Sequence, residues 1–236
     1  MKNLLKISAI VFVLILGKTA NAQEFLIGAG GGYATFAMTQ TKDYNQWAKN
    51  NLPFTPVLTD DFPGWYFYDA ELLYSLPKIM AAGLKVSTTS TGSRLHLSDY
   101  SGEYTFDNSQ SVWITGIKLL LGKAPGKQSG PCFSVEGGIS YSSMNFDEEL
   151  KVYDEEQTDS QDFNALGFYV QPGVSYLQKM GKHIILSANV SYHLGFEKGY
   201  YVKGEKDLKI TNLETGEKIK PDWNGLRAGI VVYWGL

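Results

Sequence analysis

The last eleven residues of the chain, Leu226-Arg-Ala-Gly-Ile-Val-Val-Tyr-Trp-Gly-Leu236, alternate strictly in character. Every even position from Leu226 to Leu236 carries an apolar side chain. The odd positions carry small, polar or aromatic side chains and include Arg227. Because successive side chains of a β-strand point to opposite faces, this pattern predicts a strand with one face in lipid and Arg227 pointing inward.

Seven further segments show the same alternation, at residues 25–33, 66–74, 80–86, 113–121, 133–141, 166–176 and 184–194. The chain is also rich in Gly (25) and Tyr (15), as barrels with tight turns and aromatic girdles are. We therefore predict an all-β fold, an eight-stranded antiparallel transmembrane up-and-down β-barrel. A soluble, lipocalin-like barrel is the competing architecture, but it would need the apolar face inside, where the charged residues stand.

Two regularities support the membrane barrel. Outward aromatic residues recur eight positions apart in four strands, which is close to the height of the apolar band of a membrane barrel: Phe25/Tyr33, Tyr66/Tyr74, Phe133/Tyr141 and Phe168/Tyr176. Short connections at 77–78, 122–131 and 178–182 alternate with long ones at 38–64, 89–110, 144–164 and 196–224. This pattern of periplasmic turns and outer loops predicts an outer-membrane location with both termini in the periplasm.

The chain begins with the features of a secretory signal peptide. Lys2 and Lys6 precede an apolar run of about ten residues, which is too short for a membrane-spanning helix, and Ala20-Asn21-Ala22 is a cleavage site. We therefore expect a cleaved signal peptide over residues 1–22 and a single barrel domain over residues 23–236. The mature chain keeps 18 basic and 24 acidic residues, so nothing suggests nucleic-acid binding. Cys132 is the only cysteine, which excludes an intramolecular disulfide.

The predicted inward face carries three acids and three bases. Eight strands leave an interior only wide enough for side chains, where charges must be paired to be tolerated. We expect ion pairs and hydrogen bonds, the latter also with Gln171, Asn189 and Tyr169, to fill the lumen, so the protein is not a general porin. The predicted network consists of Asp69, Glu71, Lys85, Lys118, Glu136 and Arg227.

No catalytic or metal-binding motif stands out, so we predict neither enzymatic activity nor a cofactor. Ser191 and His193 share a strand face, but the predicted register points them into the lumen, where interior hydrogen bonding explains them. The third outer loop has eight acids against Lys151: Asp147, Glu148, Glu149, Asp154, Glu155, Glu156, Asp159 and Asp162. We read it as a solvated loop, with a divalent cation bridging it to lipopolysaccharide phosphates as a minor alternative, because the spacing fits no EF-hand.

The first and fourth outer loops differ from the third. The first carries aromatic residues and prolines, which suggests a contact surface or a loop packed over the barrel mouth: Tyr44, Trp47, Phe54 and Phe62. In the fourth, apolar and polar residues alternate around Glu214-Thr-Gly216. This alternation suggests a hairpin that extends the strands above the membrane.

The eight-strand pattern resembles the OmpA/OmpX-type small barrels. The start of the mature chain, Phe25-Leu-Ile-Gly-Ala-Gly-Gly-Gly-Tyr33 after Ala20-Asn-Ala-Gln23, resembles the outer-membrane barrels of Bacteroidota, including the PorT-like group. Arg227, Gly229, Val232 and Trp234 are similar to the barrel-assembly signal, which implies the insertion machinery as a partner. The chain departs from that signal by ending in Gly235-Leu236 rather than in an aromatic residue.

The resemblance to PorT-like proteins implies a non-enzymatic structural or interaction protein in envelope protein secretion, with basic periplasmic turns as the contact face. A surface barrel of the OmpX type, acting in adhesion or defence, is the alternative. A lipid-modifying enzyme and a narrow selective pore are less favoured. The expected surroundings are the outer-membrane bilayer, lipopolysaccharide and envelope or secretion-complex proteins.

Overall fold

The structure is a computed structural model that describes residues 25–76, 80–100, 102–122, 129–153, 155–212 and 216–235. The predicted signal peptide and the predicted turn at residues 77–78 lie outside this part of the chain. Eight strands form the barrel: β1 (Phe25–Ala34), β3 (Trp65–Leu76), β4 (Met80–Asp99), β5 (Gly102–Gly122), β6 (Gly130–Val152), β7 (Glu155–Lys179), β8 (Ile184–Glu197) and β11 (Gly225–Gly235).

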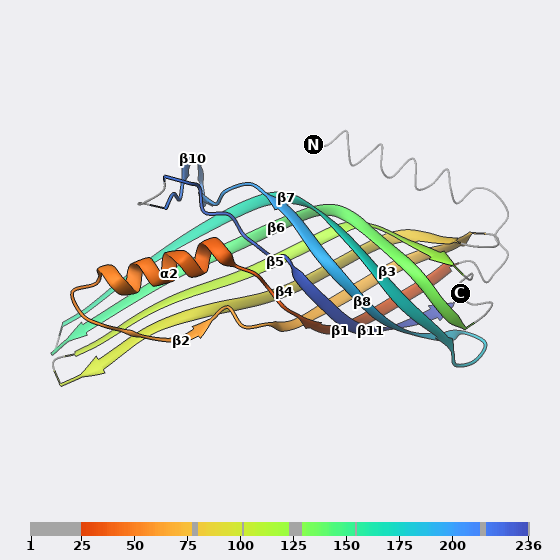
Figure 1. Cartoon of the computed structure of the whole chain (residues 1–236), viewed down its shortest axis with the longest axis horizontal. Helices are drawn as coiled ribbons and strands as arrows, with labels where there is room; N and C mark the ends of the chain where they lie inside the picture. The colour runs from red at the N-terminus through yellow and green to blue at the C-terminus, as the bar shows by residue number, and fades with distance from the viewer. Residues whose placement is uncertain are drawn as a thin grey trace.

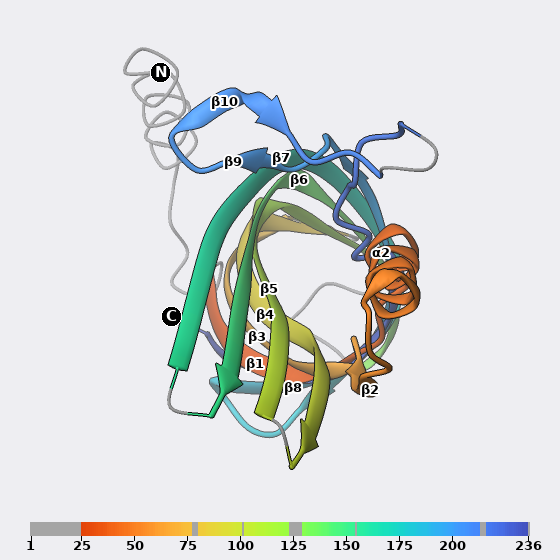
Figure 2. The same cartoon turned by 90° about the vertical axis from the view of Figure 1, so that its left-hand side faces the viewer.

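These strands close a ring. Each is antiparallel to the barrel strand before and after it, and β1 pairs with β11 from Leu26↔Gly235 to Ala34↔Arg227. Figure 2 looks into the ring from one end. Each predicted strand corresponds to one of the eight, so the predicted up-and-down barrel is confirmed.

The outer face of the barrel is apolar, and the middle of the inner face is polar and charged, with buried apolar clusters on either side of it. Residues such as Ile27, Ile117, Val174 and Ile230 are exposed by 51 to 57% on the outside, while the charged residues of the same strands are buried inside. A continuous apolar belt of this size is unsuited to water. The barrel therefore crosses a membrane, with its apolar face in lipid.

The strands differ in length. The strands β4 to β7 have 20 to 25 residues, whereas β1, β3, β8 and β11 have 10 to 14. About ten extra residues on each long strand extend one side of the barrel by roughly 30 Å, seen at the left of Figure 1. The loops predicted at 89–110 and 144–164 are therefore wrong, because these residues continue the strands as two long hairpins.

The first outer connection folds against this extension. It contains α2 (Thr39–Asn51) and β2 (Val57–Asp61), and β2 pairs with the outer part of β4. Figures 1 and 2 show α2 lying along the inner side of the long strands. Asn45 Nδ2 donates to Ser93 Oγ at 2.6 Å, and the ring of Tyr44 stacks on Phe146 at 5.5 Å. No helix among the described residues is long and apolar enough to cross a membrane.

The fourth outer connection contains a short hairpin, in which a turn joins β9 (Tyr201–Val202) to β10 (Glu205–Lys209), and β9 pairs with β7. Farther along, Thr211 forms an antiparallel bridge with Lys218, and Asn212 N donates to Glu217 O at 2.7 Å. These pairs flank the predicted hairpin around Glu214-Thr-Gly216, of which residues 213–215 lie outside the described part of the chain.

Candidate functional site

Five of the six predicted interior charges form one buried network. Lys118 Nζ lies 2.7 Å from Glu71 Oε1 and 3.4 Å from Glu136 Oε1. Lys85 Nζ lies 3.0 Å from both Asp69 Oδ2 and Glu136 Oε2. All five side chains are at most 4% exposed. Alternating charges from four neighbouring strands thus fill the middle of the lumen.

Tyr233 links this network to β11, which is separated from β3 by β1 alone. Its hydroxyl donates to Glu71 Oε2 at 2.5 Å. A Cβ on Gly28, which faces the lumen from β1, would lie only 2.6 Å from the Tyr233 ring. The missing side chain at Gly28 therefore leaves the space that Tyr233 needs to lie over β1 and reach Glu71 on β3.

Arg227 is placed inside, as the alternation predicts, but it does not join the network. It is 1% exposed, and none of its guanidinium nitrogens has a hydrogen-bond partner among the described residues. Its guanidinium carbon lies 5.6 Å from the ring centroid of Phe67. The charge is offset by the nearby carboxylates through space rather than by contact.

Ser191 and His193 share a partner but do not form a catalytic pair. Gln171 Nε2 donates to Ser191 Oγ at 3.0 Å and to Glu136 Oε2 at 3.1 Å, and Gln171 Oε1 lies 3.1 Å from His193 Nδ1. The other ring nitrogen of His193 has no hydrogen-bond partner among the described residues. The predicted role of Gln171 in interior bonding matches this geometry. Of the two other predicted partners, Tyr169 stacks on His193 at 5.1 Å, and Asn189 is only partly buried.

Apolar side chains close the mouth of the barrel above Arg227. The cluster includes Met38 and Phe62 from the first connection and Trp223 from the fourth, all at most 2% exposed. Trp223 Nε1 donates to Ser142 Oγ at 2.9 Å, and its ring meets Phe36 edge-on at 5.1 Å. Together with the ion pairs below, this cluster fills the lumen from its middle to its outer mouth.

The predicted acidic loop is instead part of β6 and β7. Asp147, Glu148 and Glu149 lie on β6, and Glu155, Glu156, Asp159 and Asp162 lie on β7, while Asp154 falls outside the described residues. Neighbouring carboxylates on one strand point to opposite faces, which disperses their charge. No group of three or more His, Cys, Asp or Glu side chains suited to a metal ion occurs in the described part of the chain.

On the inner side of the extension, Glu148 faces aromatic residues. Burial, together with the negative charge of Glu148, raises the pKa of both Tyr44 and Tyr104. Both phenols therefore stay neutral at physiological pH. Tyr44 and Tyr104 pack with Phe54, Phe106 and Phe146 between α2 and the strands, which makes the extension a firm, packed unit.

The outward face of β4 to β7 is built in rows, because paired residues of neighbouring strands lie side by side. The girdle row is Thr88, Trp113, Tyr141 and Leu166. We call the parts of the four strands above it the projecting sheet. Its first three rows are Ser90, Ser111, Ser143 and Asn164; then Gly92, Ser109, Asn145 and Asp162; then Arg94, Asp107, Asp147 and Ser160.

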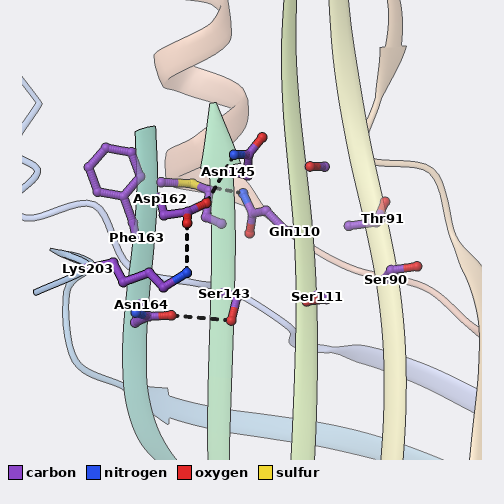
Figure 3. A pocket seen from close by; sticks show the side chains of 12 residues that line it. Ser90, Thr91, Gln110, Ser111, Ser143, Asn145, Asp162, Phe163, Asn164 and Lys203 are labelled. Atoms are coloured by element: carbon purple, nitrogen blue, oxygen red, sulfur yellow. Dashed lines mark hydrogen bonds and ion pairs between the residues drawn. The ribbon is translucent and has the colours of Figure 1, made fainter. Parts of the chain in front are cut away.

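Small side chains in these rows leave the outward face hollowed. Two adjoining hollows of about 320 and 540 Å³ share Ser90, Thr91 and Ser109. Figure 3 shows the first, which ends at an ion pair between Lys203 Nζ and Asp162 Oδ2 at 2.8 Å. The second reaches Trp65. We call the two hollows together the outer groove; most of its residues had been assigned to loops from the sequence.

No model of a known protein family matches the chain, and no curated protein is similar to it in sequence. The resemblance to PorT-like and Bacteroidota barrels thus stays a prediction. Two solved structures of Ail, the attachment invasion locus protein of Yersinia pestis, are similar to the chain at 8% identity over 90% of its length. One covers 96% of Ail with a TM-score of 0.35, and the other, in complex with the heparin analogue sucrose octasulfate, covers 98% with a TM-score of 0.39.

Proposed function

We propose that this protein is a non-enzymatic outer-membrane barrel that acts at the cell surface through the projecting sheet. The observation that carries the proposal is the unequal length of the strands. The strands β4 to β7 are about ten residues longer than the other four barrel strands, and α2 and β2 brace the extra length. A structure that served only to span the membrane would need no such extension. The proposed function therefore follows the alternative given by the sequence, a surface barrel that acts in adhesion or defence, rather than the secretion role.

The filled lumen supports an interaction role over transport or catalysis. Ion pairs occupy the middle of the lumen and the Trp223 cluster occupies its outer mouth. Ser191 and His193 are buried inside the barrel, away from lipid, and both are held by Gln171. The outward side of the projecting sheet is the large polar surface that remains available to a partner.

The orientation belongs to the same proposal. The described chain starts and ends at the barrel end opposite the projecting sheet, since Leu26 pairs with Gly235 there. An outward projecting sheet therefore puts both termini in the periplasm. Cysteines introduced at Glu149 and at Lys179 would test this with a membrane-impermeant thiol reagent on intact cells, in a Cys132→Ser background. We expect labelling at position 149 alone, and labelling at position 179 alone would reverse the orientation.

The secretion role implied by the PorT-like resemblance stays a prediction. The short turns carry five lysines, which would form the contact face: Lys78, Lys123, Lys127, Lys179 and Lys182. Lys179 and Lys182 are exposed, and the other three lie outside the described residues. Crosslinking in intact cells separates the two roles. Capture of secretion proteins that disappears when the turn lysines are replaced would favour secretion.

The surface role can be tested by removing the projecting sheet. In this variant, short glycine-serine turns replace residues 39–61, 92–109 and 145–162, which leaves the eight membrane-spanning segments. Cells with equal amounts of folded variant and wild-type barrel would be compared for attachment to host-cell or matrix surfaces and for survival in serum. We expect the variant to lose the activity that the wild type confers. Equal activity of the two would remove the projecting sheet as the functional element.

A further inference from the structure

We propose that the outer groove binds the neutral, hydroxyl-rich sugars of the glycolipid that surrounds the barrel in the outer leaflet. The proposal rests on the outward orientation of the projecting sheet given above. It adds a ligand class and a binding site to the proposed surface role. The site lies on the outward side of the projecting sheet, away from α2 and from the tips of the long hairpins.

The position of the outer groove identifies the source of the sugar. Trp113 and Ser111 lie on the same face of β5, two residues apart, so the polar surface starts about 7 Å above the last lipid-facing side chain. Aromatic girdles mark the interface between the apolar core and the head groups. The rows that line the outer groove rise from the girdle row by about 20 Å along the strands. The outer groove thus opens sideways above the head groups, towards the sugars of a neighbouring glycolipid rather than towards the external medium.

The groove presents free hydroxyl groups. The side chains of Ser90, Ser109 and Ser111 face outward, and no hydrogen bond to any of them occurs among the described residues. Each hydroxyl can donate one hydrogen bond and accept others, which matches the alternating donors and acceptors of a sugar. The small serines also leave the backbone open to close approach, which makes room for a ring.

The polar groups beside these serines are held in place. Tyr141 donates its hydroxyl hydrogen to Asn164 Oδ1 at 2.8 Å, and Asn145 Nδ2 donates to Asp162 Oδ1 at 3.1 Å. Side chains fixed in this way lose little further entropy when a ligand binds. Trp65 lines the far end of the groove and is 50% exposed, so its face is open to the apolar side of a sugar ring.

Charge excludes phosphorylated sugars. The groove is lined by two cations and four carboxylates, Asp60, Asp107, Asp147 and Asp162. Both cations are already engaged: Arg94 binds Asp107 through two contacts of 2.6 Å, and Lys203 binds Asp162. A phosphate would therefore meet carboxylates without a free cation, whereas sugar hydroxyls can donate to those carboxylates.

The experiment uses the full-length mature barrel in phospholipid nanodiscs with one of two rough-type lipopolysaccharides. The two share their lipid part and inner acidic sugars, and only one carries the neutral outer-core sugars. Native mass spectrometry would count the glycolipid retained per barrel. We expect the wild type to prefer the longer lipopolysaccharide by at least about fivefold, the effect of one ordinary hydrogen bond. Contacts to acyl chains cannot produce this preference, because they are the same in both.

Ser109→Leu is the test variant, because Ser109 lines both hollows. Ser98→Leu makes the same change on the same face beyond the groove, where the side chain is also exposed. We expect the preference to vanish in Ser109→Leu and to persist in Ser98→Leu, with heat-modifiable gel mobility showing that both variants are folded.

Three results would overturn the proposal. They are equal retention of the two lipopolysaccharides by the wild type, a preference that survives Ser109→Leu, and binding of the soluble outer-core oligosaccharide without any preference in the membrane. The last would assign the groove to an external glycan. None of these results bears on the proposed surface role. That role is tested separately, by loss of attachment when the whole projecting sheet is removed.

Discussion

Replacing Lys118 by methionine would test whether the interior ion pairs hold the barrel together. Lys118 Nζ contacts Glu71 at 2.7 Å and Glu136 at 3.4 Å, and its side chain is 3% exposed. The five-member network carries a net charge of −1, and the substitution changes it to −2. Removing one partner of a buried pair costs about 3–5 kcal/mol, because the remaining charge is left uncompensated. We expect the free energy of unfolding to fall by that amount.

The assay is urea-induced unfolding of the refolded barrel in lipid vesicles, followed by tryptophan fluorescence and heat-modifiable gel mobility. Lys203→Met is the matched control, since Lys203 makes an ion pair of similar length with Asp162 but is 65% exposed. Solvent screens such an exposed pair, so the urea midpoint of unfolding of Lys203→Met should match that of the wild type. Adding Glu71→Gln to Lys118→Met removes the uncompensated carboxylate and should restore about half of the loss or more.

A loss below about 1 kcal/mol for Lys118→Met would refute the reasoning. It would mean that water or side-chain rearrangement screens the interior. Failure of Glu71→Gln to restore stability would show that the lysine stem, rather than its charge, makes the contribution.

Four further predictions concern other contacts. Arg227→Met should destabilise less than Lys118→Met in the same unfolding assay, because the guanidinium has no hydrogen-bond partner among the described residues. Gly28→Val should cost about 1–3 kcal/mol, because its Cβ would displace the Tyr233 ring. Asn45→Ala removes the bond to Ser93 and should speed protease cleavage between residues 39 and 61 without changing barrel mobility on gels. Burial raises the pKa of Asp61, so the protonated carboxyl group stabilises the fold at low pH. This contribution is lost as the pH rises through the raised pKa. Asp61→Asn should therefore remove the pH dependence of protection against protease between residues 39 and 61.

The membrane-spanning part of the fold could be predicted because lipid imposes a simple pattern. A lipid-facing position must be apolar, whereas its neighbour faces the lumen and can be polar, as at Leu226 and Ala228 with Arg227 between them. The inward direction of Arg227 and Lys118 followed from the same alternation. Which carboxylate meets which cation did not follow, because Lys85 on β4 reaches over β5 to contact Glu136 on β6, a strand that is not its neighbour.

The projecting sheet escaped prediction because it follows a different rule. Above the girdle row the outward residues are polar, and several inward ones, such as Thr91, Ser93 and Asn108, are polar as well. Their burial depends on α2, which itself shows no clear apolar stripe and buries Thr41 and Asn45. The alternation of Tyr104, Phe106 and Asn108 with exposed or half-exposed residues was the available signal that β5 continues.

The distribution of interior charges along the chain has a consequence for how the barrel closes. All five members of the network come from β3 to β6, so neighbouring hairpins can compensate one another before the ring is complete. What they leave is a single excess negative charge. Arg227 comes from β11, the last described strand in chain order, and its positive charge balances this excess. We therefore expect the attraction between Arg227 and the carboxylates of β3 to β6 to draw β11 inward as it docks, and to favour pairing of β11 with β1 over pairing with another chain.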